Sequence, residues 1–147
     1  MLSRDVVISH FCHHIPPRNF AYLRNLARHL PNYQFGITRH SRLRGCGTAN
    51  VFPANDKKEV WGVVYDVCDD DLMILDGFED GYRREILPVY ALGDGQSPIN
   101  VLVYVAELEI DVPLPNAEYR RLILEGAKHW NLPIAYLSVL EEIQTAC

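Results

Sequence analysis

The chain has 147 residues, of which 48% are hydrophobic and 22% are charged, and its formal net charge is −5. These proportions are typical of a soluble globular protein, and the length is enough for one domain with a hydrophobic core. A negative chain without a basic cluster argues against a nucleic-acid partner. No apolar run approaches the roughly 20 residues that span a bilayer, so no membrane partner is expected.

The beginning of the sequence predicts a strand rather than a secretion signal. Val6–Phe11 is a short apolar run that Ser9 and His10 interrupt, so it lacks the continuous apolar segment of a signal peptide. The four cysteines form no CxxC pair: Cys12, Cys46, Cys68 and Cys147. We therefore expect a cytoplasmic protein with free thiols.

The next part of the chain predicts one helix and several strands. The apolar residues of the range 20–30 recur with helical spacing after Pro16 and Pro17, and Pro31 ends the pattern. Strands are predicted at Tyr33–Thr38, Thr48–Phe52 and Val60–Val67. The sequence PANDKK between the last two predicts a hairpin-like connection.

A short helix is predicted next, because Asp69–Asp71 can cap its positive N-terminal end. Leu72, Leu75 and Glu79 follow at helical spacing, which places them on one face. Two of the three are apolar and should face the core, so Glu79 would project from the apolar face near the helix C-terminus. Burial and the helix dipole both disfavour its ionised form, which suits proton transfer near neutral pH. The alternative is a solvated residue at a fraying helix end.

The rest of the sequence completes an α+β pattern. Strands are predicted at Arg84–Leu92 and Asn100–Glu107, followed by a helix at Ala117–Trp130 and a last helix that begins near Ile134. We predict a single domain over residues 1–147, with a curved, mostly antiparallel sheet or small barrel and flanking helices.

Three segments of the sequence resemble the γ-glutamylcyclotransferase-like (AIG2-like) superfamily. They are VWGVVYDV, LDGFEDGYRR and PLPNAEYRRLILEGAKHWNLP, and the upstream GCGTANVFPA fits the strand that precedes the first of them. The resemblance covers most of the chain from Gly45 onward. It implies the γ-glutamylcyclotransferase-like fold and an enzyme that needs no cofactor.

The resemblance also implies a reaction, in which Glu79 is the catalytic general acid/base. In the family, this glutamate takes a proton from the substrate α-ammonium, and the freed amine attacks the γ-carbonyl to form 5-oxoproline. The leaving amine then receives the proton. The expected small-molecule substrate is therefore a γ-glutamyl amine or a γ-glutamyl amino acid.

The family's Y-G-S-N loop, whose main chain holds the γ-glutamyl group, is replaced in this sequence. The four positions of that loop are occupied here by Phe11, Cys12, His13 and His14. Ile15 follows them. Main-chain N–H donors could survive the change. However, Cys12 replaces a glycine, which permits close approach and positive φ. The change falls at the expected substrate-binding site.

The resemblance places further substrate-binding residues later in the chain. Three tyrosines match pocket-lining positions: Tyr82, Tyr104 and Tyr119. A phenol offers an apolar ring and one polar group, which suits the orientation of a small zwitterion. Arg84 is the candidate for a bidentate contact with a substrate carboxylate, because it shares one side of a strand with Tyr82.

Other chemistries are open at the N-terminal loop. His10, Cys12 and His14 would share one face of an extended strand and could bind zinc, but no fourth ligand is visible. Cys12 with a neighbouring histidine would form a nucleophile pair, but adjacent residues of an extended chain point apart. We therefore expect no metal.

Two other functions also remain open. The replaced loop fits an enzyme that keeps the fold and Glu79 but performs a cyclisation, isomerisation or lyase step on another small metabolite in a biosynthetic pathway. A non-catalytic small-molecule-binding protein is the third possibility. A homodimer is plausible by analogy alone.

Overall fold

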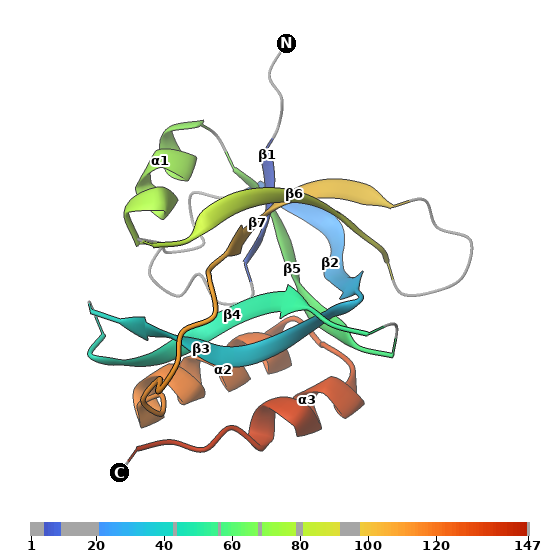
Figure 1. Cartoon of the computed structure of the whole chain (residues 1–147). Helices are drawn as coiled ribbons and strands as arrows, with labels where there is room; N and C mark the ends of the chain where they lie inside the picture. Colours follow the sequence, from blue (N-terminus) through green and yellow to red (C-terminus); the bar gives the residue numbers. More distant parts are fainter. Residues whose placement is uncertain are drawn as a thin grey trace.

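The computed structural model of the chain describes residues 5–9, 21–42, 44–55, 57–67, 69–78, 81–91 and 98–146. These residues form a mixed α+β domain with two sheets and three helices (Figure 1), as the sequence predicts. The strands are β1 (Asp5–Ser9), β2 (Ala21–Pro31), β3 (Tyr33–Ser41), β4 (Cys46–Pro53), β5 (Glu59–Val67), β6 (Arg83–Val89) and β7 (Ile99–Val105). The helices are α1 (Asp69–Phe78), α2 (Ala117–His129) and α3 (Ile134–Glu141).

The larger sheet has the strand order β2-β5-β1-β7-β6 and curves until its two outer strands meet. Its pairs are antiparallel except for β1 with β7. His29 of β2 and Tyr90 after β6 form an antiparallel bridge, in which each backbone N–H donates to the other's carbonyl at 2.9 and 3.0 Å. The sheet therefore closes toward a small barrel.

The smaller sheet, β3 with β4, lies between the larger sheet and the two C-terminal helices (Figure 1). Helix α2 buries one face, because Tyr119, Ile123 and Ala127 recur every four residues and are at most 6% exposed. Asn116 caps this helix, since its Oδ1 accepts the Tyr119 backbone N–H at 2.7 Å. The cap fixes where the helix begins and thereby directs Tyr119 toward the sheets.

The prediction of a helix over residues 20–30 is wrong. Ala21–Pro31 forms β2, which pairs antiparallel with β5 and has a register shift between Tyr22 and Ala27. This irregularity is why the segment lacks the strict alternation of a strand in its sequence. Pairing with the interior strand β5 outweighs the local helical spacing.

The prediction of a hairpin between Thr48–Phe52 and Val60–Val67 is also wrong, although both segments are strands. β4 pairs with β3, whereas β5 pairs with β1 and β2 in the other sheet. Asn32, at φ 65°, holds the crossing between the sheets: its N–H donates to Lys58 O and its carbonyl accepts from Ala54 N–H, both at 2.9 Å. In the described ranges, no helix is long and apolar enough to cross a membrane.

Candidate functional site

The predicted catalytic residue Glu79 and the predicted loop Phe11–Ile15 lie outside the described residues, so their roles stay predictions. Helix α1 ends at Phe78, the residue before Glu79. Leu72, on the face that the sequence assigns to the core, is 3% exposed. The structure describes the chain up to Phe78 and again from Gly81 onward, and the contacts of these two parts are given below.

Two of the predicted pocket tyrosines meet at Ala49 of β4. Tyr82, just before β6, donates its hydroxyl hydrogen to the Ala49 carbonyl at 2.6 Å. Tyr119, at the start of α2, accepts the Ala49 backbone N–H at 2.9 Å. Since β4 belongs to a two-stranded sheet, one of its edges has no partner among the strands that the structure describes. In a larger sheet, the N–H and the carbonyl of Ala49 would bond to a further strand. In this protein the two tyrosine hydroxyls bond to them instead and fix Ala49 in place.

Each of these tyrosines also carries an arginine over its ring. The Cζ atom of Arg39 lies 5.2 Å from the centroid of the Tyr82 ring. The Cζ atom of Arg44 lies 4.8 Å from the centroid of the Tyr119 ring. Cations at this distance are attracted by the ring face. Nothing in the spacing of the sequence indicated these two contacts.

The remaining predicted residues, Arg84 and Tyr104, meet at the carboxylate of Asp76 on α1. Arg84 Nε donates to Asp76 Oδ1 at 3.0 Å, and a second guanidinium nitrogen donates to Oδ2. The Tyr104 hydroxyl donates to Asp76 Oδ1 at 2.5 Å. Arg84, predicted to bind a substrate carboxylate, thus binds a carboxylate of its own chain in this structure. The contact ties α1 to β6 and β7, three residues before Glu79.

The charges of this cluster are mutually stabilising. The hydrogen bond from Arg84 is the main reason why the pKa of Asp76 lies below its usual value. Burial, followed by the hydrogen bond to Asp76, raises the pKa of Tyr104, so the phenol stays protonated near neutral pH. Asp76 was missed as a site residue, although it is the first aspartate of the quoted segment LDGFEDGYRR.

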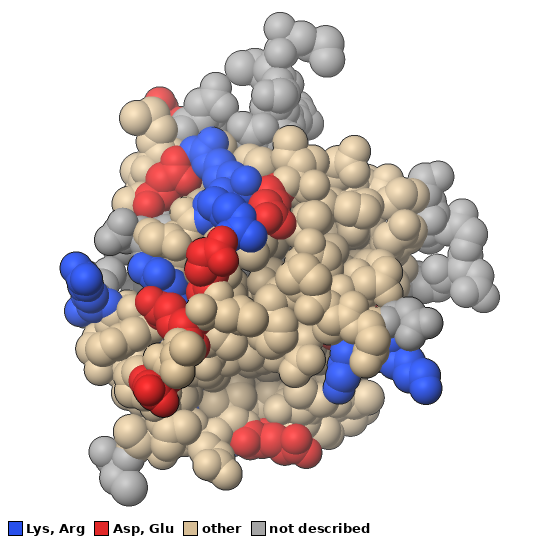
Figure 2. All heavy atoms as spheres, viewed as in Figure 1, with Lys and Arg blue, Asp and Glu red and all other residues tan. Residues whose placement is uncertain are grey.

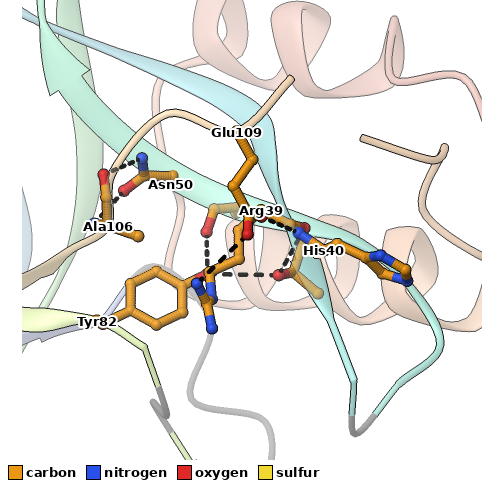
Figure 3. A network of polar contacts seen from close by, with 8 residues as sticks. Arg39, His40, Asn50, Tyr82, Ala106 and Glu109 are labelled. Atoms are coloured by element: carbon orange, nitrogen blue, oxygen red, sulfur yellow. Dashed lines mark hydrogen bonds and ion pairs between the residues drawn. The ribbon is translucent and has the colours of Figure 1, made fainter. Parts of the chain in front are cut away.

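A buried amide joins the two sheets beside the tyrosine contacts (Figure 3). Asn50 of β4 is 1% exposed; its Nδ2 donates to the Ala106 carbonyl at 2.8 Å, and its Oδ1 accepts the Ala106 N–H at 2.9 Å. Both groups of the side chain are therefore satisfied. This pair fixes the segment that follows β7 against β4.

Positive and negative side chains lie next to one another over the part of the surface where Figure 1 shows α1 and β6 (Figure 2). Arg83 of β6 contacts Glu85 at 2.9 Å and Glu107 at 2.8 Å, next to the pair of Arg84 with Asp76. Each of these two arginines has a carboxylate neighbour. Among the residues that the structure describes, no group of three or more histidine, cysteine, aspartate or glutamate side chains is arranged to hold a metal.

A family model described as "Gamma-glutamyl cyclotransferase, AIG2-like" matches residues 17–131. The chain belongs to this family. The match includes the segment of Glu79 and the described site residues, so the resemblance recognised in the sequence is confirmed. A comparison with curated protein sequences gave no match.

Solved structures share the cyclotransferase fold over nearly the whole chain. One described as a gamma-glutamyl cyclotransferase has a TM-score of 0.80 at 21% identity, covering 97% of this chain and 89% of that one. An uncharacterized human protein has a TM-score of 0.81 with the same identity and coverage. A yeast gamma-glutamyl cyclotransferase specific to glutathione has a TM-score of 0.60 at 14% identity, covering 95% of this chain and 94% of that one. At these identities, the likeness concerns the fold.

The structure arranges the predicted cyclotransferase residues in two clusters. Tyr82 and Tyr119 meet at Ala49 of β4, whereas Arg84 and Tyr104 meet at Asp76 of α1. The two clusters anchor the chain just after and just before Glu79, respectively. Their use in substrate binding stays a prediction.

Proposed function

We propose that the protein releases 5-oxoproline and a free amine from a γ-glutamyl amine or γ-glutamyl amino acid, with Glu79 as the general acid/base. The family match is the first support. The observation that carries the proposal is the meeting of Tyr82 and Tyr119, two pocket positions of the family, at Ala49. Separate elements thus bring these side chains together, and Tyr82 follows Glu79 by three residues in the sequence.

The proposed reaction needs no water, redox partner or cofactor. The Glu79 carboxylate accepts a proton from the substrate α-ammonium, and the free amine forms a bond to the γ-carbonyl carbon. The γ-carbonyl oxygen becomes an oxyanion, for which the main-chain amides of Phe11–Ile15 are the proposed donors. The bond to the leaving amine then breaks as Glu79 returns the proton to that nitrogen, and the second proton that the ring nitrogen loses on becoming an amide is also taken up by the leaving amine, which departs as an ammonium ion.

The enzyme's main contribution is orientation, because both reacting groups belong to one substrate. A five-membered ring forms without a second reactant, so correct alignment removes much of the barrier. The described anchors serve this requirement: Asp76 is tied to β6 and β7, and Tyr82 is tied to β4. We propose that they hold the segment of Glu79 at a constant place relative to the substrate.

The test is a panel of substrates with the wild-type protein and Glu79→Gln. The panel contains γ-glutamyl amines, γ-glutamyl amino acids and glutathione, the last because one protein of this fold is described as specific to it. Mass spectrometry quantifies 5-oxoproline. We expect release by the wild type and at least about a hundredfold less by Glu79→Gln, since a lost general base typically costs that much. Equal release by both proteins would contradict the role of Glu79.

A second function is favoured by one sequence observation, the replacement of the family's Y-G-S-N loop at Phe11–His14. The same fold and Glu79 would then act on another small metabolite in a cyclisation, isomerisation or lyase step. This alternative predicts no 5-oxoproline from any member of the panel. It also predicts that chemistry on the true substrate is lost in Glu79→Gln.

A further inference from the structure

The backbone at Gly81, two residues after Glu79 in the sequence, accommodates an arginine from another strand. Gly81 has φ +84°, a conformation that favours glycine. A Cβ atom built at Gly81 would lie 1.8 Å from Nη2 and 2.3 Å from Cζ of Arg39. The guanidinium group therefore occupies the space that a side chain would take, directly against the Gly81 backbone.

Arg39 contacts the next residue as well. Its guanidinium lies over the ring of Tyr82, with 5.2 Å between Cζ and the ring centroid. The Tyr82 hydroxyl is fixed in turn by the 2.6 Å hydrogen bond to Ala49. Arg39 thus packs against both Gly81 and Tyr82, the second and third residues after Glu79.

Arg39 is itself held in place (Figure 3). Its carbonyl accepts a hydrogen bond from Thr48 Oγ1 at 3.3 Å, and its Nη1 lies 3.8 Å from Glu109 Oε1. Glu109 Oε2 accepts the His40 backbone N–H at 2.5 Å, and the Glu109 N–H donates to Thr38 O at 3.2 Å. Because Glu109 is bound to β3 at two points, it fixes the direction of the arginine side chain, which is 20% exposed.

We propose that Arg39 is a positioning residue for the acid/base carboxylate. It holds the Gly81–Tyr82 backbone that continues from Glu79, and it keeps a positive charge beside that backbone. A nearby positive charge favours the ionised form of a carboxylate, which is the form that accepts the substrate proton. The inference rests on the proposed function, because it assigns the proton transfer to Glu79.

The kinetic test compares Arg39→Gln, Arg39→Lys and a matched control, Arg121→Gln, whose arginine forms exposed pairs with Glu118 and Glu125 on α2. Arg39→Gln should lower kcat at least about tenfold with KM changed less than about threefold, because misplaced groups slow the chemical step. The acid limb of kcat/KM against pH should move to higher pH, since loss of the positive charge raises a carboxylate pKa. Arg39→Lys should return the acid limb to its wild-type pH, because lysine restores the positive charge. The control Arg121→Gln should match the wild type in all three quantities.

A second measurement needs no activity. Amide hydrogen exchange of the peptide that contains residues 79–82 should be at least about threefold faster in Arg39→Gln, because a local opening becomes easier. The control variant and a peptide from α3 should be unchanged. Gly81→Ala, which places a side chain where the guanidinium lies, should give the same increase.

The outcomes separate the two proposals. If the wild type releases no 5-oxoproline but Arg39→Gln accelerates exchange at 79–82, the proposed function fails and the role of Arg39 in holding the turn stands. If the wild type is active but Arg39→Gln keeps its kcat, its acid limb and its exchange rates, the role of Arg39 is overturned and the proposed function stands. A uniform loss of protection over the whole chain would also overturn it, because Arg39 would then act only on global stability.

Discussion

Tyr82 and Tyr119 bind the same residue of β4 from two separate elements. The Tyr82 hydroxyl donates to the Ala49 carbonyl at 2.6 Å, and the Tyr119 hydroxyl accepts the Ala49 N–H at 2.9 Å. Two predicted pocket residues therefore also support the smaller sheet. A substitution at either tyrosine should affect stability and activity together.

Replacing Tyr119 by phenylalanine should destabilise the protein by about 1–3 kcal/mol, because the part-buried Ala49 N–H loses its acceptor. Tyr82→Phe should cost about 1 kcal/mol, since a carbonyl tolerates a lost donor better than an N–H tolerates a lost acceptor. Urea unfolding at constant pH measures both. A cost for Tyr119→Phe no greater than that for Tyr82→Phe would contradict this account of Ala49.

The Asp76 cluster should make stability depend on pH. The pKa of Asp76 is lowered in the folded state, chiefly by the hydrogen bond from Arg84. Its charge therefore contributes stability above the usual value of 3.8, and this contribution is lost as the pH falls through the folded pKa. Because the side chains are 38% and 41% exposed, the contribution should be at most about 1 kcal/mol.

The variant Asp76→Asn tests this dependence by urea unfolding at several pH values. The difference in unfolding free energy from the wild type should be largest between pH about 5 and 7 and should shrink below pH about 3. Adding Arg84→Gln completes a double-mutant cycle, in which the two effects should be less than additive because both remove one contact. A difference that does not change with pH would contradict the ion pair.

Two glycines should respond oppositely to alanine. A Cβ at Gly47 of β4 would lie 2.0 Å from the Pro113 carbonyl oxygen, a backbone atom that cannot easily move. Gly47→Ala should therefore cost about 1–3 kcal/mol or more by overpacking. Gly77 in α1 has open space around its Cα and is exposed, so Gly77→Ala should stabilise by about 0.5–1 kcal/mol. Thermal unfolding of both variants decides whether β4 and the Pro113 segment are as close as described.

Asn50→Asp should lower the free energy of unfolding in a pH-dependent way, because it disturbs the hydrogen bonds between β4 and Ala106. At neutral pH, a carboxylate cannot donate to the Ala106 carbonyl and would be charged at a site that is 1% exposed. The loss should exceed about 2 kcal/mol. Burial would raise the pKa of the new carboxyl, so the loss should begin above pH about 4 and should be complete above the folded pKa. A loss that persists unchanged at pH about 4 would contradict the assigned hydrogen bonds.

The elements of the second half of the chain could be predicted because local signals agree there with the fold. Asn116 caps α2 as the sequence before Ala117 suggests, and the expected α1 begins at its aspartates. β2 could not be predicted, because its pairing with β5 is decided by residues far away in the sequence. The partner of β4 was mistaken for the same reason: a turn-like segment indicates a reversal of the chain, but not which sheet receives the next strand.

The candidate site was predictable in its residue types but not in its contacts. The motif positions led to Tyr82, Arg84, Tyr104 and Tyr119, which meet in two clusters of the structure. Nothing in the spacing indicated that Arg84 binds Asp76 or that Arg39 packs against Gly81, because both contacts join elements whose order in space is set by the sheets. Side-chain partners across sheets depend on the register of the strands, which the sequence alone did not determine.

The most direct measurement follows the oxygen and nitrogen atoms of the reaction. The best substrate of the panel is converted in water enriched in ¹⁸O, and mass spectrometry quantifies 5-oxoproline, glutamate and the released amine. Intramolecular attack predicts unlabelled 5-oxoproline and free amine in equal amounts, lost together in Glu79→Gln. Release of ¹⁸O-labelled glutamate instead would show that water is the nucleophile and would contradict the proposed cyclisation.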